Sequence, residues 1–303
     1  MKCPDESLTL RSRAKSFYFA SLFLPKKIRG EVEQLYIFCR YLDDLGDNPK
    51  LGKQQSYNKL LTIKNDIKKE KSSNPIVNNF IQLMKRYSIN NKIPIDLITG
   101  IQSDLKKVQI KNFDELLIYS YRVAGTVGIM FCKIIGLKKN DIIFRGIQLG
   151  IAMQLTNISR DINEDLNMER IYLPITFRSY KKGNIDKIQN NKEIQKVISE
   201  DLVVFLKKVN KIYSNSWNGI YFLEFKYALP ISIAAELYQN IGIKIIAKNG
   251  NIWNERFYLN LWEKIFFSFK AFFKIITKNK IDINYNIDSE IKRILNSLDV
   301  KIS

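Results

Sequence analysis

Apolar residues recur every three or four positions along most of this chain, which is the spacing of one buried face of an α-helix. Within residues 28–45, for example, Val32, Leu35, Cys39 and Leu42 follow this rhythm. Similar patterns predict further helices at residues 54–69, 75–87, 94–108, 113–136, 141–167, 199–213, 228–247 and 262–280. Residues 178–195 are polar and are expected to form a loop. Because no alternating β-type pattern competes, we expect residues 1–303 to form a single all-α domain, a helical bundle.

The composition removes several kinds of chemistry. Histidine is absent from the 303 residues, which excludes His-based triads, imidazole acid–base catalysis and His-ligated zinc. The three cysteines, Cys3, Cys39 and Cys132, form no CxxC pair and indicate a reduced intracellular chain rather than a disulfide framework. Any metal site must therefore use oxygen ligands, which favours Mg²⁺ or Mn²⁺.

The formal net charge of +19 raises the question of an anionic partner. Lysine is spread along the whole chain together with Ile and Asn, so we interpret it mainly as a solvated basic surface, with an anionic substrate or membrane surface as alternatives. No nucleic-acid-binding motif is present, and nucleic acid is not an expected partner. Neither a secretory signal nor an uncharged stretch of the ~18–20 residues that cross a bilayer is found. We expect a cytoplasmic protein, either soluble or peripherally bound to a membrane.

The first acidic motif is YLDDLGD, residues 41–47. Asp43 and Asp47 are four residues apart, so they differ by only about 40° around a helix and share one face. That face continues from Tyr36 and Cys39 in an otherwise buried region. Carboxylates grouped there repel one another and lose hydration unless a cation compensates. A divalent metal ion would meet that need.

The second motif places Asn157, Asp161 and Asp165 at positions i, i+4 and i+8, a stripe that drifts about 80° over two helical turns. The preceding residues, 149–155, are almost wholly apolar, so the stripe leads out of a hydrophobic interior. Either motif alone is also compatible with a solvated helix end. Two acidic faces that meet in one bundle instead suit Mg²⁺ ions that clasp a diphosphate and make it a leaving group.

Five segments, in order over about 250 residues, resemble the squalene/phytoene synthase family. Residues 14–25 (AKSFYFASLFLP) are similar to the family's opening segment, and residues 35–47 (LYIFCRYLDDLGD) to its first aspartate motif. Residues 121–128 (YRVAGTVG) resemble its central small-residue helix, and residues 154–174 its second aspartate motif. A weaker match covers residues 234–262.

The resemblance implies an isoprenoid-synthase bundle around a central apolar cavity. It also implies a Mg²⁺-dependent prenyltransferase, with Mn²⁺ as a possible substitute, that joins two allylic prenyl diphosphates head to head through a cyclopropylcarbinyl diphosphate. YRVAGTVG favours phytoene synthesis from the C20 substrate geranylgeranyl diphosphate. The C15 substrate farnesyl diphosphate remains an alternative and would give squalene (with NADPH), presqualene diphosphate or dehydrosqualene. Asp44 leaves this choice open, because many phytoene synthases carry Glu there. A non-catalytic assembly factor of the same fold is a remote alternative.

The resemblance also assigns roles to single residues of this chain. The metal ligands would be Asp43, Asp47, Asn157, Asp161 and Asp165. The catalytic residues would be Tyr36, Arg40, Tyr119, Arg160 and Tyr238. The substrate-binding residues would be Ser16, Phe17, Val123, Val127, Gln154 and Arg256, with Ile129 and Met153 as further lining of a dry tunnel. Surface ion pairs for the arginines, and ordinary core positions for the others, are the alternatives.

Residues 262–280 combine five phenylalanines with five lysines. A basic aromatic helix of this kind could rest on an anionic membrane. It could equally pack its phenylalanines against the bundle.

Overall fold

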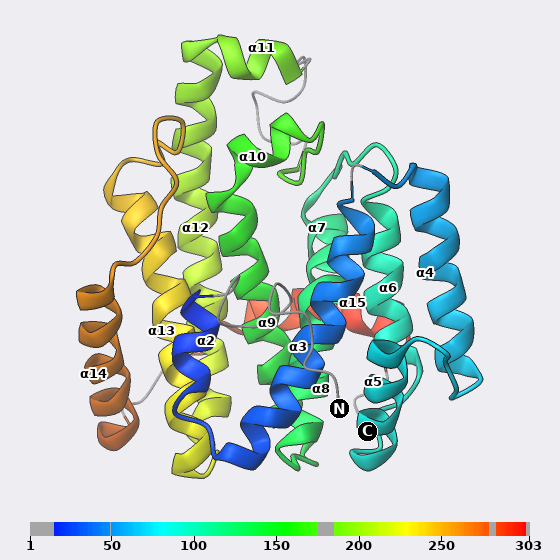
Figure 1. Cartoon of the computed structure of the whole chain (residues 1–303). Coiled ribbons are helices and arrows are strands. Elements are labelled where there is room, and N and C mark those ends of the chain that lie inside the picture. The colour runs from blue at the N-terminus through cyan, green and yellow to red at the C-terminus, as the bar shows by residue number, and fades with distance from the viewer. Residues whose placement is uncertain (1–14, 49, 175–184, 279–282, 301–303) are drawn as a thin grey trace.

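The computed structural model describes residues 15–48, 50–174, 185–278 and 283–300, most of which lie in helices (Figure 1). The helices are α2 (Lys15–Ser21), α3 (Lys26–Gly46), α4 (Lys53–Lys68), α5 (Pro75–Arg86), α6 (Lys92–Ser103), α7 (Phe113–Ser120), α8 (Thr126–Ile134), α9 (Asn140–Arg160), α10 (Ile162–Asn167), α11 (Ile185–Asn190), α12 (Lys192–Ile220), α13 (Phe225–Ala247), α14 (Leu261–Thr277) and α15 (Tyr285–Ser297). A π-helical turn, η2 (Tyr121–Gly125), joins α7 to α8. The predicted all-α class is confirmed.

Several predicted boundaries were wrong. The helix expected at 94–108 ends at Ser103, and the one expected at 141–167 is divided at Asp161, whose backbone (φ −103°, ψ 11°) leaves the helical region. Of the loop expected at 178–195, residues 178–184 lie outside the described part of the chain. The rest contains α11 and the start of α12, which Asn191 caps by accepting hydrogen bonds from two backbone N–H groups. Helix α12 therefore reaches well beyond the predicted 199–213 at both ends.

Helix α9 is the centre of the bundle and packs against α8, η2, α12 and α13. Its contact with α8 brings the two backbones together: a Cβ added to Gly128 would lie 2.5 Å from the carbonyl oxygen of Gly146. Such a distance is sterically impossible, so only glycine fits at this crossing. The small residues of 121–128 thus serve helix packing, and they bring α9 and α8 together as neighbouring walls of the site.

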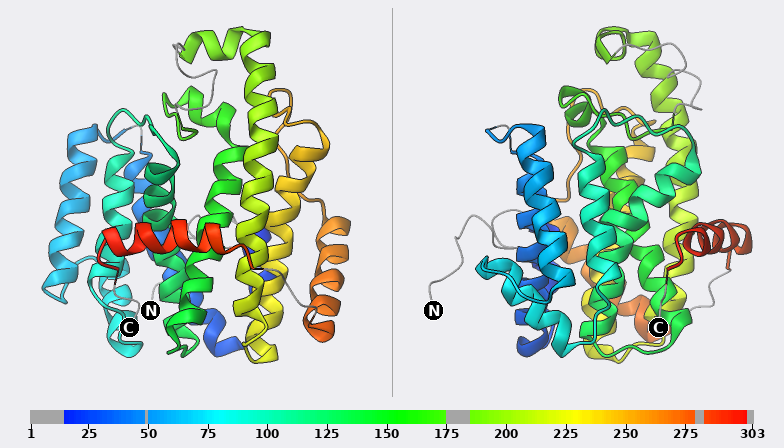
Figure 2. Two further views of the ribbon diagram at one scale, coloured as in Figure 1. Left: turned by 180° about the vertical axis from the view of Figure 1, so that it is seen from behind. Right: turned by 90° about the vertical axis from the view of Figure 1, so that its right-hand side faces the viewer.

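Two helices near the C-terminus, α14 and α15, cover the outside of the bundle. Figure 2 shows α15 running crosswise over the back of the bundle, where it contacts α7 and α12. Helix α14 lies along α13 at one side of the molecule (Figure 1). Helices α2 and α15 were not predicted from the sequence.

Candidate active site

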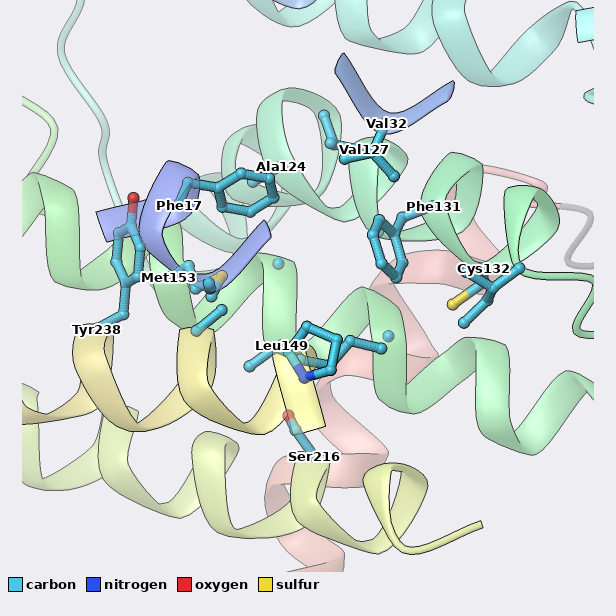
Figure 3. A pocket seen from close by; sticks show the side chains of 18 of the residues that line it. Phe17, Val32, Ala124, Val127, Phe131, Cys132, Leu149, Met153, Ser216 and Tyr238 are labelled. Carbon is cyan, nitrogen blue, oxygen red and sulfur yellow. The ribbon is translucent and has the colours of Figure 1, made fainter. Parts of the chain in front are cut away.

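An apolar cavity of about 300 Å³ opens inside the bundle, between α2, α3, η2, α8, α9, α12 and α13. Figure 3 shows Phe17, Val127 and Leu149 reaching it from three different helices. Of the residues expected to bind substrate or line the tunnel, Phe17, Val123, Val127, Met153 and Gln154 line this cavity. Ile129 does not: it is fully buried in the surrounding core, so that expectation was wrong. Ser16 is half-buried on α2 and lies outside the lining.

A second, polar pocket of about 190 Å³ adjoins the apolar one. Asp43 and Asp47 of α3 line it, together with Asp104, Tyr119 and Arg170. Val123 and Gln154 line both spaces, so one pair of side chains forms the partition between them. An apolar compartment therefore ends at an acidic one.

The carboxylates of the first acidic motif lie close enough to repel one another. Asp43 lines the polar pocket and its side chain is exposed to solvent there, but protein atoms and other carboxylates crowd around it. Burial raises the pKa of Asp43 to about 7, and the charges of Asp47 and Asp104 add to that shift while Arg40 opposes it. Asp47 pairs with Arg170 at 2.8 Å. A cation in this pocket would relieve the repulsion.

The second motif is more heavily neutralised by arginine. Arg160 holds Asp161 with two hydrogen bonds of 2.7 and 2.6 Å, and Arg256 reaches the same carboxylate at 3.1 Å. Arg256 also pairs with Glu164 at 3.1 Å. The predicted stripe keeps its hydrogen-bonded spacing across the break, because the N–H groups of Asp161 and Asp165 still bond the carbonyl oxygens four residues earlier.

Asp165 and Asn157 complete this side of the site. Burial raises the pKa of Asp165 to about 7; Asp161 and Asp104 add to the shift and Arg170 opposes it. Asn157 lines the apolar cavity, and its buried Oδ1 has no hydrogen-bond partner among the described residues. An unsatisfied buried oxygen is costly, so it marks a place where a ligand would be favoured.

Asp104 was missed in the sequence and links the two motifs. It follows the last residue of α6 and accepts hydrogen bonds from Tyr119 (3.0 Å) and Tyr172 (2.9 Å). Its charge contributes to the raised pKa of both Asp43 and Asp165, so all three carboxylates face one region. A lone Asp near a predicted helix end carries no repeat that would have revealed it. Arg170, also missed, lies within the segment that resembles the second motif.

The three predicted tyrosines line the same two spaces. Tyr36 and Tyr238 line the apolar cavity and Tyr119 the polar pocket. Burial raises the pKa of Tyr238 and of Tyr119, so both phenols stay protonated near neutral pH. Arg40 pairs with Asp44 one helical turn along α3. Asp43 and Asp47 of the first motif thus line the polar pocket and Asn157 of the second lines the apolar cavity, whereas Asp161, Asp165 and the three predicted arginines line neither.

A sequence profile of the squalene/phytoene synthase family matches residues 10–263. The chain belongs to this family. Among squalene/phytoene synthase family members, 15-cis-phytoene synthase of Pantoea ananas is 28% identical over 262 residues, covering 82% of this chain and 84% of the relative. Phytoene synthase of Arthrospira platensis is 29% identical over 269 residues, covering 83% and 86%. A dehydrosqualene synthase crystal structure superposes with a TM-score of 0.73 at 26% identity, covering 88% and 94%. The predicted family is confirmed.

The oxygen ligands of this chain fit a metal site completed by substrate oxygens better than a site formed by protein side chains alone. Within the described ranges, no group of three acidic or thiol side chains is close enough to hold a metal ion. Mg²⁺ usually takes one or two carboxylates and completes its shell with water and substrate phosphates. The crowded Asp43 and Asp165 and the unpaired Asn157 oxygen suit that kind of binding.

Proposed function

We propose that this chain is a Mg²⁺-dependent prenyltransferase that joins two geranylgeranyl diphosphates head to head, through a cyclopropylcarbinyl diphosphate, to 15-cis-phytoene. The observation that carries the proposal is the apolar cavity that adjoins an acidic pocket, with Val123 and Gln154 lining both. A prenyl diphosphate has the same division, with a hydrocarbon tail and an anionic head. The names of the two phytoene synthase relatives support the C20 substrate.

The polar side of the site would bind the diphosphate heads. The proposed ligands of Mg²⁺, or of Mn²⁺ in its place, are Asp43, Asp47, Asn157, Asp161 and Asp165; when bound, the ion neutralises the diphosphate and makes it a better leaving group. Arg40, Arg160 and Arg256 would exchange part of their carboxylate contacts for phosphate oxygens, to which a guanidinium fork is well matched.

The apolar side would protect the carbocations that follow ionisation. Phe17 and Val127 supply no nucleophile, and together with Met153 they keep water away from the reacting carbons. With no histidine in the chain, the released diphosphate would accept the proton that is lost. The hydroxyl groups of Tyr36, Tyr119 and Tyr238 would orient it by hydrogen bonds, since the raised pKa of Tyr119 and of Tyr238 keeps these two phenols protonated.

Farnesyl diphosphate is the second candidate substrate, favoured by the 26% identical dehydrosqualene synthase structure. It would lead to dehydrosqualene, presqualene diphosphate or, with NADPH, squalene. A non-catalytic assembly role fits less well, because the chain retains the acids of both motifs.

The deciding experiment incubates the purified full chain with Mg²⁺ and either the C15 or the C20 diphosphate, with and without NADPH. We expect phytoene from the C20 substrate and no need for NADPH. C30 products alone would replace the C20 assignment with the C15 one. Absence of diphosphate release from both substrates, with a folded protein, would reject the enzyme.

We also propose that α14 makes peripheral contact with an anionic membrane. Trp262, Phe266, Phe269 and Phe273 lie on its outer face and are 79%, 64%, 62% and 61% exposed. Phe267 packs toward the core and Phe272 against Phe225, so the alternative of packing on the bundle describes only these two. Lys270 and Lys274 form salt bridges of 3.1 Å each with the buried Glu236. The main contribution to membrane binding would therefore come from burial of the aromatic face. Among the described residues, no helix is long and apolar enough to span a bilayer. Lys280, the last lysine of the predicted basic aromatic segment 262–280, lies outside the described residues.

A further inference from the structure

Arg145 of α9 is the one charged residue among the described side chains that line the apolar cavity. A guanidinium stays charged at any physiological pH. An unpaired charge in an apolar wall is costly, and a positive charge would also repel the carbocations of the proposed reaction. The cavity can therefore hold a prenyl chain only if this guanidinium is kept out of it.

A carboxylate from the far end of the chain holds it in place. Arg145 Nη1 donates to both oxygens of Asp288 on α15, each at 2.8 Å, and to Oε1 of Gln148 at 2.8 Å. Asp288 also accepts hydrogen bonds from Gln148 Nε2 (2.7 Å) and Asn215 Nδ2 (2.6 Å). Gln148, Asn215 and Asp288 are all buried. Asp288 thus has a partner for each of its oxygens and directs Arg145 toward α15.

The backbone at α12 leaves room for this path. A Cβ added to Gly219 would overlap Cβ of Arg145 and lie 3.0 Å from its Cγ. The stem of Arg145 therefore passes α12 where the glycine has no side chain. Its guanidinium is paired with Asp288 and Gln148, neither of which lines the cavity.

Helix α15 is fixed at the point from which Asp288 acts. Asn215 of α12 accepts a hydrogen bond from the backbone N–H of Asn284 (2.8 Å) and donates to its carbonyl oxygen (3.0 Å). Asn284 in turn caps α15 by accepting from the N–H of Ile287 (3.1 Å). The crosswise helix at the back of the bundle in Figure 2 is thereby joined to the cavity wall.

We propose that Asp288 is a positioning residue that keeps the Arg145 guanidinium out of the apolar cavity, and so determines how long a prenyl chain the cavity accepts. The inference rests on the proposed function. Arg145 precedes the unpaired Asn157 by twelve residues of the same helix, about 18 Å along the axis. Its side chain therefore borders the part of the cavity far from the diphosphate site, where a C20 tail extends further than a C15 tail.

The test compares Asp288→Asn with wild type on both substrates. Without the carboxylate charge, Arg145 can turn into the cavity, and the ratio of kcat/KM for C20 over C15 falls by about tenfold or more, mainly through a higher KM for C20. Affinities for unreactive C15 and C20 thiolodiphosphates should change in the same direction. In R145M/D288N the cation is gone, and the ratio returns toward that of wild type.

Arg293→Gln is the matched control. It breaks the exposed pair between Arg293 of α15 and Asp114 (2.7 Å), which also links α15 to the bundle but lies outside both pockets. The ratio should stay unchanged in this variant. If D288N and R293Q lower the rates on both substrates equally, or if R145M/D288N does not restore the ratio, Asp288 is only structural.

A second variant guards against misfolding of D288N. Asn215→Ala removes one hydrogen bond to Asp288 and the contact with Asn284 but keeps both charges. It should lower the C20 to C15 ratio in the same direction by a smaller factor, and an unchanged ratio would overturn the inference. A wild-type chain that neither binds nor converts either substrate would instead reject the proposed function itself.

Discussion

At the scale of single residues, Asp104 has the most informative surroundings. Two tyrosine hydroxyls fix its carboxylate, and its charge acts on an acid from each motif. A group in that place supports proposed metal ligands without needing to bind a metal itself. Support of this kind typically changes metal affinity or activity by 10–100-fold when it is removed.

We therefore expect Asp104→Asn to lower activity by about 10–100-fold and to raise the Mg²⁺ concentration needed for half-maximal rate. The neutral amide keeps one acceptor for the tyrosines but no longer supplies charge to the polar pocket. The measurement is a Mg²⁺ titration of diphosphate release. Asp96→Asn is the control, because Asp96 lies on α6, the helix that Asp104 follows, and accepts from Tyr121 (3.4 Å) outside both pockets. Equal effects of the two variants would contradict a special role for Asp104.

The effect of Gly219→Ala on the free energy of unfolding tests whether the Arg145 side chain packs against Gly219. The added methyl group has no space beside the Arg145 stem, so we expect a loss of about 1–3 kcal/mol in the free energy of unfolding. Gly30→Ala on α3 is the matched change, since nothing lies within 4 Å of its added Cβ, and it should gain up to about 1 kcal/mol. Thermal or urea unfolding measures both. A neutral Gly219→Ala would mean that the stem is free to move aside.

At the scale of helices, apolar periodicity predicted the long amphipathic elements well. Helix α5, for example, runs Pro75–Arg86 where 75–87 was expected, with a proline at its first position and the Asn74 side chain capping it. Periodicity could not show the break at Asp161, because the four-residue spacing of oxygen side chains continues through it. Nor did it show the π-helical turn at Tyr121–Gly125.

Helix α15 was missed although Ile287, Ile291 and Ile294 follow a helical spacing. It is short and polar outside that face, and what fixes it is the pairing of Asp288 with residues about 140 positions away. Asp104 was missed for the same reason. Long-range partners of single polar residues are set by tertiary structure and leave no local pattern in the sequence.

For α14 we expect loss of membrane binding when its exposed face is made polar. The variant W262S/F266S/F269S/F273S removes aromatic area that would enter the interface, without touching the lysines that pair with Glu236. Co-sedimentation with vesicles containing anionic lipid measures it, with Val204→Ser on α12, 68% exposed, as control. Binding that survives the fourfold change would reject the membrane proposal, and a concentration-dependent dimer lost in the variant would assign the face to a second copy.

At the scale of the whole molecule, the net charge of +19 coexists with a strongly acidic pocket. The net positive charge of the chain therefore does not extend to the site. The polar pocket instead gathers carboxylates whose mutual repulsion a bound cation would reduce. The family, the bundle and both motifs could be predicted from the sequence. The adjoining arrangement of the two pockets required the fold.

We expect Mg²⁺ and inorganic diphosphate to stabilise the protein together far more than either does alone. The described side chains offer no group of three acids for a metal ion, so the ion needs the oxygens of diphosphate to complete its shell. Ligands that bind only the folded state raise the melting temperature according to their occupancy. Thermal unfolding with each ligand and with both tests this, and purely additive shifts would contradict it. Chelation by EDTA should abolish the joint effect.

The shared partition of Val123 and Gln154 has a consequence for how this protein can change. Each side chain touches the compartment for the anionic head and the one for the greasy tail. A bulkier or shorter replacement at either position must alter both compartments at once. Substitutions at these two positions that change the accepted hydrocarbon length therefore also change the binding of pyrophosphate. Substitutions deeper along α9 can change the accepted hydrocarbon length alone.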